Sequence, residues 1–590
     1  MPNKIQTLPP VIAVVFLLTG FCLYGSAGHD DSHITFWASY TLKEFGEILN
    51  YNGDRIEQSS SLLLTVLTAL LAKLFQADVV TSGYVLTLLS GAGAILMTWK
   101  LAARFNLTRL PLTATIILTT SPAFLLWNTS GMESTLAALC LLWFVIQWAE
   151  LLSSDATPTP PSVASAALAT LALISVRPEM ITLVAGIAFA LFLYRKLFLF
   201  QGKGSVQTVV FYTTLLLCIG LLVSFRFFYF GAPMPLPVSA KVSTLSIDKL
   251  WSGSLYLLHY GMANIIFLVS LPVALLYLFR QDKKTKPDYY FLLSAFSLLG
   301  YCIFILLSGG DWMQMGRFLV PVLPLAAVIS TRHLSDSLKN PLLNALFIAA
   351  ILGLNIQANW QSLKHQSHGT PVWASYHISP AHQHRYSLFE QYNQEHLRDM
   401  DVIDTLDATI DSLINSGVQP INIMSGQSGM VFFYTAQKYF KPAVDNPLHF
   451  YDSHALVEDS LLKCTLLKDI PRSSQGLYFD FDGFFARQPG LQENCGIPKP
   501  DILYDINDMT RQLPERMATQ GYTLIHREGG KMVETKSGLP TNTLPAANLV
   551  MVANDLLPDL ETTEIKIIRY QEKPLVNRWL RLRSASSDAP

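Results

Sequence analysis

Long apolar runs, separated by short polar connectors, fill the first 358 residues of the chain. Each run has about the length that an α-helix needs to cross a bilayer, and few charges interrupt it. The pattern therefore predicts a multi-pass α-helical membrane protein with about eleven transmembrane helices. Their expected bounds are 10–27, 79–99, 110–126, 134–152, 163–176, 180–197, 207–225, 260–279, 288–308, 318–331 and 341–358.

Two further stretches predict helices that do not cross. Between residues 34 and 49, apolar side chains recur at helical spacing, with Ser39 and three charged residues on the opposite face. Such a stripe is typical of a helix that lies in the membrane interface. Residues 61–75 are apolar but short, and a crossing there would place the basic connector 100–109 outside, against the positive-inside rule. We expect a second interfacial or re-entrant helix at 61–75.

The basic residues also predict orientation. Lys4 precedes the first apolar run, so the N-terminus is expected in the cytoplasm and residues 1–27 are expected to form an uncleaved anchor. Alternation then places the most basic connectors inside and the tail outside. In an oxidising compartment, Cys464 and Cys495 of the tail can pair, closing a loop of about 30 residues worth roughly 3–4 kcal/mol.

Composition divides the chain into two parts. Of its 590 residues, 51% are hydrophobic and only 14% are charged, where a soluble domain has about 25%. The apolar runs stop near residue 358, which predicts a transmembrane domain at 1–358 and an extracytoplasmic α/β domain at 359–590. The net charge of −1 gives no indication of a nucleic-acid partner.

Charged residues gather at the predicted outer ends of the spans. A carboxylate at a lipid boundary is costly unless it is paired or used, and Arg and Lys at an interface suit a phosphate head group. Ordinary flanking charges that pair with one another remain an alternative for each residue alone. The group consists of Asp30, Asp31, Glu133, Arg177, Glu179, Arg226, Lys241, Asp311 and Arg317.

Motifs around these residues resemble one family in the same order. The opening Asp30-Asp31-Ser32-His33-Ile34 is similar to its "DDAYI", and Arg177-Pro178-Glu179 is similar to its "RPE". The family is the arabinofuranosyltransferase-like branch of the GT-C polyprenyl-phosphate-dependent glycosyltransferases, which includes the mycobacterial terminal arabinofuranosyltransferase. The other matching stretches are 48–62, 121–124 with 130–133, 231–241, and 309–313 with 317–321.

The resemblance implies a membrane-embedded inverting glycosyltransferase of the bacterial cytoplasmic membrane. Its donor would be a polyprenyl-phosphate-linked sugar, such as a pentofuranose, and its acceptor a cell-envelope glycan or glycolipid. Asp30 or Asp31 would be the general base, with Asp30 slightly favoured. The resemblance implies substrate-binding roles for the remaining residues, with the cations holding the phosphate and Arg226 a weaker candidate. The substrate-binding set is Glu133, Arg177, Glu179, Lys241, Asp311 and Arg317.

Departures from the family pattern lie around the expected sugar pocket. His33 stands where the family has an aromatic residue, so the identity of the donor sugar cannot be carried over from the family to this chain. No cofactor follows from the sequence, although His29 and His33 are four residues apart and leave a divalent metal open. His259 follows an apolar run, where a core or interface position is the main alternative to a catalytic one.

The tail reads as alternating helices and strands. Residues 406–416 predict a helix, 421–424 a strand, 430–438 a helix, and 441–445 and 477–482 further strands. The glycine-rich turn at 425–429 lacks the lysine of a phosphate loop and fits no nucleotide pattern, so we expect it to bind no cofactor.

Two other functional classes stay open. A transporter or flippase of a lipid-linked sugar would place its sensitive residues near mid-bilayer, and an inverted repeat would support it. A non-catalytic envelope assembly protein would use the loop acids only to pair with arginine. Loss of activity on removal of one carboxylate, with the fold intact, would distinguish an enzyme from both.

Overall fold

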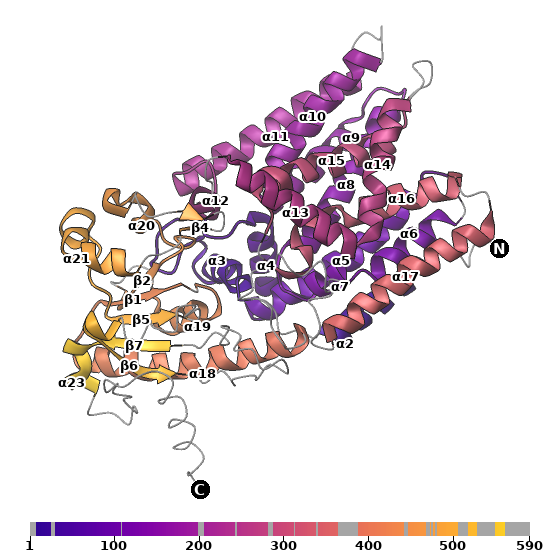
Figure 1. Cartoon of the computed structure of the whole chain (residues 1–590). Helices are drawn as coiled ribbons and strands as arrows, with labels where there is room; N and C mark the ends of the chain where they lie inside the picture. The colour runs from indigo at the N-terminus through magenta and orange to yellow at the C-terminus, as the bar shows by residue number, and fades with distance from the viewer. Residues whose placement is uncertain are drawn as a thin grey trace.

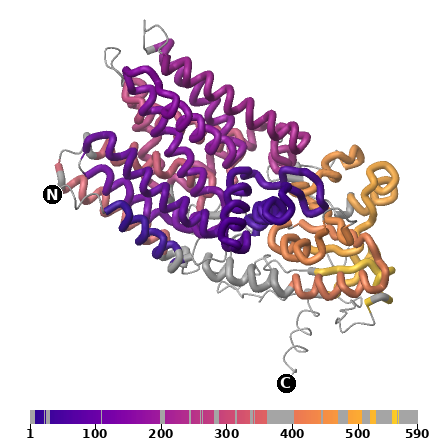
Figure 2. Tube along the Cα trace, turned by 180° about the vertical axis from the view of Figure 1, so that it is seen from behind, coloured from indigo at the N-terminus to yellow at the C-terminus, as the bar shows by residue number. Residues whose placement is uncertain are grey.

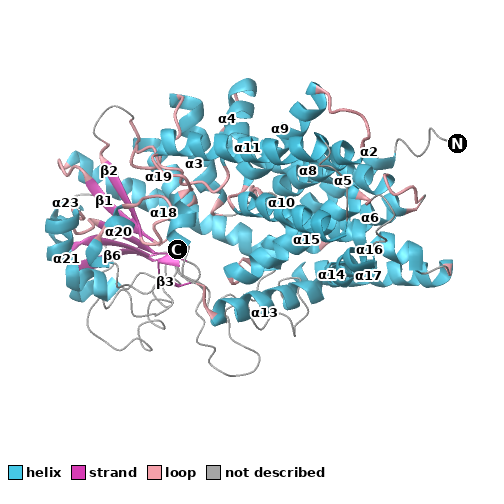
Figure 3. Cartoon of the chain, turned by 90° about the horizontal axis from the view of Figure 1, so that it is seen from above, coloured by secondary structure: helices cyan, strands magenta, loops and turns pink. Residues whose placement is uncertain are grey.

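The computed structural model contains a bundle of helices and, beside it, a small sheet with its own helices (Figure 1). Seen from above, the strands gather at one end of the molecule and the long helices occupy the rest (Figure 3). The residues described are 8–24, 30–107, 109–198, 206–241, 245–280, 287–311, 313–337, 340–363, 388–426, 428–441, 446–467, 472–473, 476–477, 481–505, 517–527 and 549–560.

The helical part runs from the N-terminal region to residue 363. Its elements are α2 (Leu8–Tyr24), α3 (Ser32–Phe45), α4 (Leu62–Phe75), α5 (Val79–Ala103), α6 (Leu110–Thr119), α7 (Pro122–Asn128), α8 (Ser134–Ser153), α9 (Pro160–Val176), α10 (Glu179–Phe198), α11 (Val206–Phe230), α12 (Leu236–Lys241), α13 (Ile247–Ala263), α14 (Ile265–Arg280), α15 (Tyr289–Ser308), the 3₁₀ helix η1 (Gln314–Val322), α16 (Leu323–Ser337) and α17 (Pro341–Leu363).

The membrane character of this part follows from helix length and composition. Within the described residues, seven helices are long and apolar enough to cross a membrane, or eight if the bent pair α6 and α7 forms one span. The segments predicted at 10–27, 163–176 and 260–279 contain the shorter apolar helices α2, α9 and α14. Every predicted span thus contains a helix and the multi-pass helical fold is confirmed, but the count of eleven spans is not.

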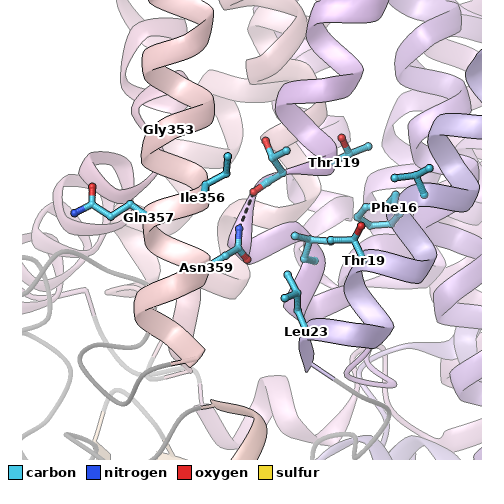
Figure 4. A pocket seen from close by; sticks show the side chains of 11 residues that line it. Phe16, Thr19, Leu23, Thr119, Gly353, Ile356, Gln357 and Asn359 are labelled. Atoms are coloured by element: carbon cyan, nitrogen blue, oxygen red, sulfur yellow. Dashed lines mark hydrogen bonds between the residues drawn. The ribbon is translucent and has the colours of Figure 1, made fainter.

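The predicted span at 110–126 is bent, because Pro122 begins a second helix. The axes of α6 and α7 differ by 65°. Carbonyl oxygens beside the bend accept hydrogen bonds from α17. Asn355 donates to Ile117 O at 3.3 Å. Asn359 donates to Thr120 O at 3.0 Å (Figure 4). These amides satisfy backbone groups that a straight helix would satisfy itself.

A cavity of about 670 Å³ lies beside this bend, between α2, α6, α7 and α17. Phe16 and Leu23 of α2 and Ile356 of α17 contribute to its mainly apolar wall (Figure 4). None of the acids and bases selected from the sequence lines this cavity.

The C-terminal part contains a five-stranded sheet in the order β2-β1-β5-β7-β6. The first three of these strands run parallel, and β7 pairs antiparallel with both β5 and β6. The elements are α18 (Leu388–Asn415), β1 (Ile421–Ser425), α19 (Met430–Tyr439), β2 (Leu448–Asp452), α20 (Ser460–Lys463), η4 (Thr465–Leu467), β3 (Arg472–Ser473), β4 (Gly476–Leu477), α21 (Phe481–Cys495), β5 (Ile502–Asp505), β6 (Tyr522–Arg527), β7 (Leu549–Ala553), η5 (Asn554–Leu556) and α23 (Leu557–Leu560).

The predicted α/β character of this part is confirmed, with differences in detail. β1 and α19 lie where the sequence predicts them. The strand predicted at 477–482 begins in β4 but is wrong at its end, because α21 begins at Phe481, and residues 478–480 lie outside the described residues. Phe484, Phe485 and Leu491 continue this segment at helical spacing and bury their side chains against the sheet. Residues 442–445 of another predicted strand lie outside the described residues.

Two further features concern connections. Cys464, at the end of α20, and Cys495, at the end of α21, are joined by a disulfide. The connector between the spans predicted at 207–225 and 260–279 contains α12 and most of α13. The side chain of Ser246 starts α13 by accepting the backbone N–H of Lys249 at 3.2 Å.

Helix α3 lies at the junction between the two parts (Figure 1; Figure 2). Trp37 and Phe36 are fully buried and belong to the same hydrophobic cluster as Phe432 and Phe433 of α19. Ser39, expected on a solvent-facing side, is also fully buried and donates to Thr35 O at 2.9 Å. Ser39 is therefore not on a solvent-facing side, because α3 packs on α4 and α5 as well as on α19, whereas Lys43 and Glu44 near its end stay partly exposed.

Candidate active site

Asp30 and Asp31 lie in the first loop, the segment directly before α3, and have different surroundings. The Asp30 carboxylate accepts the backbone N–H of Met430 at 2.5 Å, at the N-terminus of α19. Asp31 occupies the N-cap position of α3. Its negative charge acts on Lys241, the last residue of α12. One acid thus faces the C-terminal part, and its neighbour faces a cation of the helical part.

A buried arginine links two breaks between helices. Glu133 directly precedes α8, after a turn in which Gly131 has a φ of +75°. A side chain at Gly131 would overlap the ring of Tyr84, with its Cβ 2.5 Å from that ring. Arg177, between α9 and α10, forms ion pairs with both Glu133 and Glu179. Both sides of this guanidinium are therefore engaged by carboxylates.

Tyr301 of α15 completes this buried group. Its hydroxyl donates to Glu179 Oε1 at 3.0 Å. The ion pairs and this hydrogen bond connect α8, α9, α10 and α15 at one end of the bundle.

Asp311 and Arg317 form a second pair after α15. Gly309 and Gly310 turn the chain with φ values of +84° and +87°, and Arg317 Nε then donates to Asp311 Oδ2 at 2.7 Å. The Phe318 ring joins this pair to the first, because the guanidinium carbons of Arg317 and Arg177 lie 5.4 and 5.2 Å from its centroid.

Lys241 differs from these arginines. Among the described residues it has no ion-pair partner within 4 Å, and its side chain is half-buried. Burial lowers the pKa of its ammonium below the ordinary 10.5, and the negative charges of Asp31 and Asp311 oppose that change. An anionic ligand close to Lys241 would favour the charged form of its ammonium.

Arg226, a weaker candidate for holding the phosphate, is committed to another partner. Its guanidinium is fully buried and donates to both oxygens of Glu57, at 2.8 and 2.9 Å. A cation that is committed in this way is a poor phosphate ligand, so the structure argues against the weaker role given to Arg226. Sequence analysis did not select Glu57, whose partner lies 169 residues away.

The structure thus brings the predicted acids and bases to one end of the bundle. The charges of Asp31, Asp311, Arg177 and Arg317 all act on Lys241, while Glu133 and Glu179 join through Arg177. Among the residues described, no three His, Cys, Asp or Glu side chains form a group of metal-ligand type. His29 and the side chain of His259 lie outside the described residues, and the His33 ring packs 5.5 Å from that of Phe433.

The contact between the start of α19 and Asp30 was not predicted from the sequence. Met430 and Gly429 contact Asp30, although the glycine-rich turn carries no recognised ligand motif. The one feature of the sequence that could have indicated this contact is the glycine-rich turn at 425–429, which lies between a predicted strand and a predicted helix.

Comparison with known proteins places this geometry in a fold class. No family model matches the chain, and no curated protein matches it in sequence. Among solved structures, ArnT from Cupriavidus metallidurans in the apo state aligns with 94% of this chain and 99% of its own length, with a TM-score of 0.50 and 11% identity. The chain therefore has the fold of the GT-C glycosyltransferases, as its motifs indicate.

Two other proteins give weaker alignments. The archaeal oligosaccharyltransferase AglB from Archaeoglobus fulgidus, in complex with an inhibitory peptide and a dolichol-phosphate, has a TM-score of 0.46 and 11% identity over 99% of this chain and 81% of its own. The arabinofuranosyltransferase AftD from Mycobacteria has a TM-score of 0.43 and 12% identity over 93% of this chain and 40% of its own.

Proposed function

We propose that this protein is an inverting membrane glycosyltransferase. It transfers a sugar from a polyprenyl-phosphate donor to a hydroxyl of a cell-envelope glycan or glycolipid. The observation that carries the proposal is that Asp31, at the start of α3, and the ion pair of Asp311 and Arg317 lie close enough to Lys241 for their charges to act on it. An acid that takes a proton and cations that receive a phosphate are what this transfer requires.

Asp31 acts as the general base. It takes the proton of the acceptor hydroxyl while the acceptor oxygen attacks the anomeric carbon on the face opposite the phosphate. The bond between that carbon and the phosphate oxygen breaks, and the polyprenyl phosphate leaves with the electron pair. We assign the base to Asp31 rather than to Asp30, the residue preferred from the sequence, because Asp30 Oδ1 already accepts the Met430 N–H.

The cations have separate roles in this mechanism. Lys241 and Arg317 receive the negative charge that develops on the leaving phosphate. Arg177, between its two glutamates, holds the carboxylates of Glu133 and Glu179 where they can contact sugar hydroxyls. We propose that this end of the bundle and the C-terminal part are extracytoplasmic, and that the donor sugar is a pentofuranose.

Transfer by purified protein tests the proposal. Wild type, Asp31→Asn and Asp30→Asn are compared with synthetic polyprenyl-phosphate sugars and a panel of glycan acceptors. Asp248→Asn, on the exposed surface of α13, is the matched control. We expect Asp31→Asn to abolish transfer at unchanged thermal stability, since general bases contribute about 10²–10⁴-fold. Full activity of Asp31→Asn, or no transfer by wild type with any donor, contradicts the proposal.

A further inference from the structure

The carboxyl ends of β1 and β2 form a sheet edge of the kind that binds ligands in other α/β proteins. β1 ends at Ser425 and continues through a glycine-containing turn into α19, while β2 ends at Asp452 beside it. In open α/β sheets, ligands bind at this edge, and the N-terminus of the following helix favours an anion. In this chain the anion there is the Asp30 carboxylate, from the opposite end of the sequence.

The fit between Asp30 and the start of α19 depends on Gly429. Asp30 Oδ1 accepts the Met430 N–H at 2.5 Å. A Cβ added at Gly429 would lie 2.4 Å from both Asp30 O and Asp30 Oδ1, far inside van der Waals contact. Because one of these oxygens is backbone, the overlap would not be relieved by rotating a side chain. Gly429 is thus the residue that allows the two segments to meet.

The turn that carries Gly429 is itself held rigidly. The buried Asp452 carboxylate accepts the hydroxyl of Ser428 at 3.1 Å and the backbone N–H of Leu456 at 2.7 Å. From the other side, the hydroxyl of Tyr51 donates to Gly429 O at 3.3 Å. Contacts on both sides therefore fix the position of the Met430 amide.

A second attachment to the C-terminal part is made by the connector between α3 and α4. Asn52 exchanges two hydrogen bonds with the backbone of Phe450 in β2, at 2.9 and 2.7 Å. Beyond Asp31, the His33 ring packs on Phe433 and Tyr434 of α19, with centroid separations of 5.5 and 5.8 Å. The C-terminal part thus holds Asp30, the start of α3 that follows Asp31, and the connector after α3.

We propose that Gly429 and the Met430 amide are positioning groups for catalysis. By holding Asp30, they fix the adjacent Asp31 where it faces Lys241 and the acceptor. The inference rests on the proposed function, and it assigns to the C-terminal part a direct contribution to the geometry of the base. It predicts that a change of one methyl group in the C-terminal part weakens catalysis in the helical part.

Gly429→Ala is the test, with Gly490→Ala as the matched control. Gly490 lies within α21, and a Cβ there would lie 3.3 Å from a Leu466 methyl group, which is able to move. Two measurements are made on the full-length protein: hydrogen exchange of the backbone amides of residues 31–36, and kcat and KM for transfer. Thermal unfolding is followed alongside.

We expect faster exchange in residues 31–36 of Gly429→Ala and a kcat lower by about tenfold to a hundredfold, the effect of a misplacement near 1 Å, with KM for the donor little changed. Gly490→Ala should match wild type in both measurements. Unchanged exchange in Gly429→Ala overturns the inference, and so does faster exchange with unaltered kcat. No transfer by wild type contradicts the proposed function, while the exchange measurement still decides whether Gly429 holds the first loop.

Discussion

Glu57 and Arg226 form a two-point ion pair, with N–O distances of 2.8 and 2.9 Å, and both side chains are buried. The backbone carbonyl of Glu57 also accepts the N–H of Leu236, the first residue of α12. Glu57 lies in the connector after α3 and joins it to α11 through Arg226 and to α12, which ends at Lys241. The pair thus holds the connector that follows α3, the helix that Asp31 caps, beside the segment that carries Lys241.

Breaking this pair should destabilise the protein strongly. Arg226→Met leaves the Glu57 carboxylate buried without its partner, which costs roughly 3–5 kcal/mol, whereas Glu57→Leu combined with Arg226→Met removes both charges and should recover much of that loss. Thermal unfolding of the purified single and double variants measures the coupling. Additive losses in the double variant would contradict a coupled pair.

Lys241 should govern donor binding and its dependence on pH. Lys241→Met is expected to raise KM for the donor about tenfold to a hundredfold, because a charge-assisted hydrogen bond of about 1.5–3 kcal/mol is lost. Lys73→Met, an exposed lysine of α4, is the control. An unaltered KM in Lys241→Met would exclude Lys241 as a phosphate ligand.

The direction of the pH effect follows from burial. Since burial lowers the pKa of Lys241 from 10.5, the free enzyme loses this charge at a lower pH than an ordinary lysine would. KM of wild type should therefore rise as the pH approaches that lowered value from below. In Lys241→Arg the rise should move to higher pH, because the guanidinium stays protonated. Identical pH profiles would contradict this assignment.

Glu458 should make stability depend on pH. Burial raises the pKa of this carboxyl to about 7, from an ordinary 4.5. Between these values the folded protein holds a proton that the unfolded chain releases, so stability should fall as pH rises from 4.5 to 7 and level off above. The whole effect is on the order of 3 kcal/mol.

Glu458→Gln tests this prediction, because an amide does not titrate. Unfolding of the C-terminal part is measured across this pH range, and the variant should lose the slope. Asp459→Asn, whose carboxylate pairs with Lys463 near the surface, should retain it. A slope that survives in Glu458→Gln would assign the effect to another group.

The disulfide should stabilise the C-terminal part. Cys464 and Cys495 are 31 residues apart, and closing such a loop reduces the entropy of the unfolded chain by an amount worth roughly 3–4 kcal/mol. Replacing both by serine should lower the unfolding temperature, and reductant should lower it in wild type but have no further effect in the variant. Equal unfolding temperatures for wild type with and without reductant would argue against this contribution.

The apolar runs predicted the helices because a membrane imposes length and composition on each span, whatever its neighbours are. The partners of the charges were less visible. Arg177 reads as a free cation in sequence, and only the approach of α8 shows that Glu133 shares it with Glu179. Ser39 reads as solvent-facing in sequence, because no local signal shows that other elements cover its part of α3.

The candidate site was predictable as a set of residues but not as a geometry. The motifs supplied Asp30 and Asp31 together, and their order alone could not separate their roles. What separates them is Met430, which donates to one and not to the other through a contact between residues 400 positions apart. Contacts of this kind have no local sequence signature, since neither partner needs an unusual residue type apart from Gly429.

That separation along the chain also sets an order of events in biosynthesis. The ribosome completes the loop with both acids early, and the amide that holds Asp30 is added 400 residues later. While the helices insert one after another, the protein carries an unfinished site. The nascent chain acquires its ordered first loop only after α19 and the sheet have folded, so chains interrupted before α19 would reach the membrane without an ordered Asp31, the proposed base.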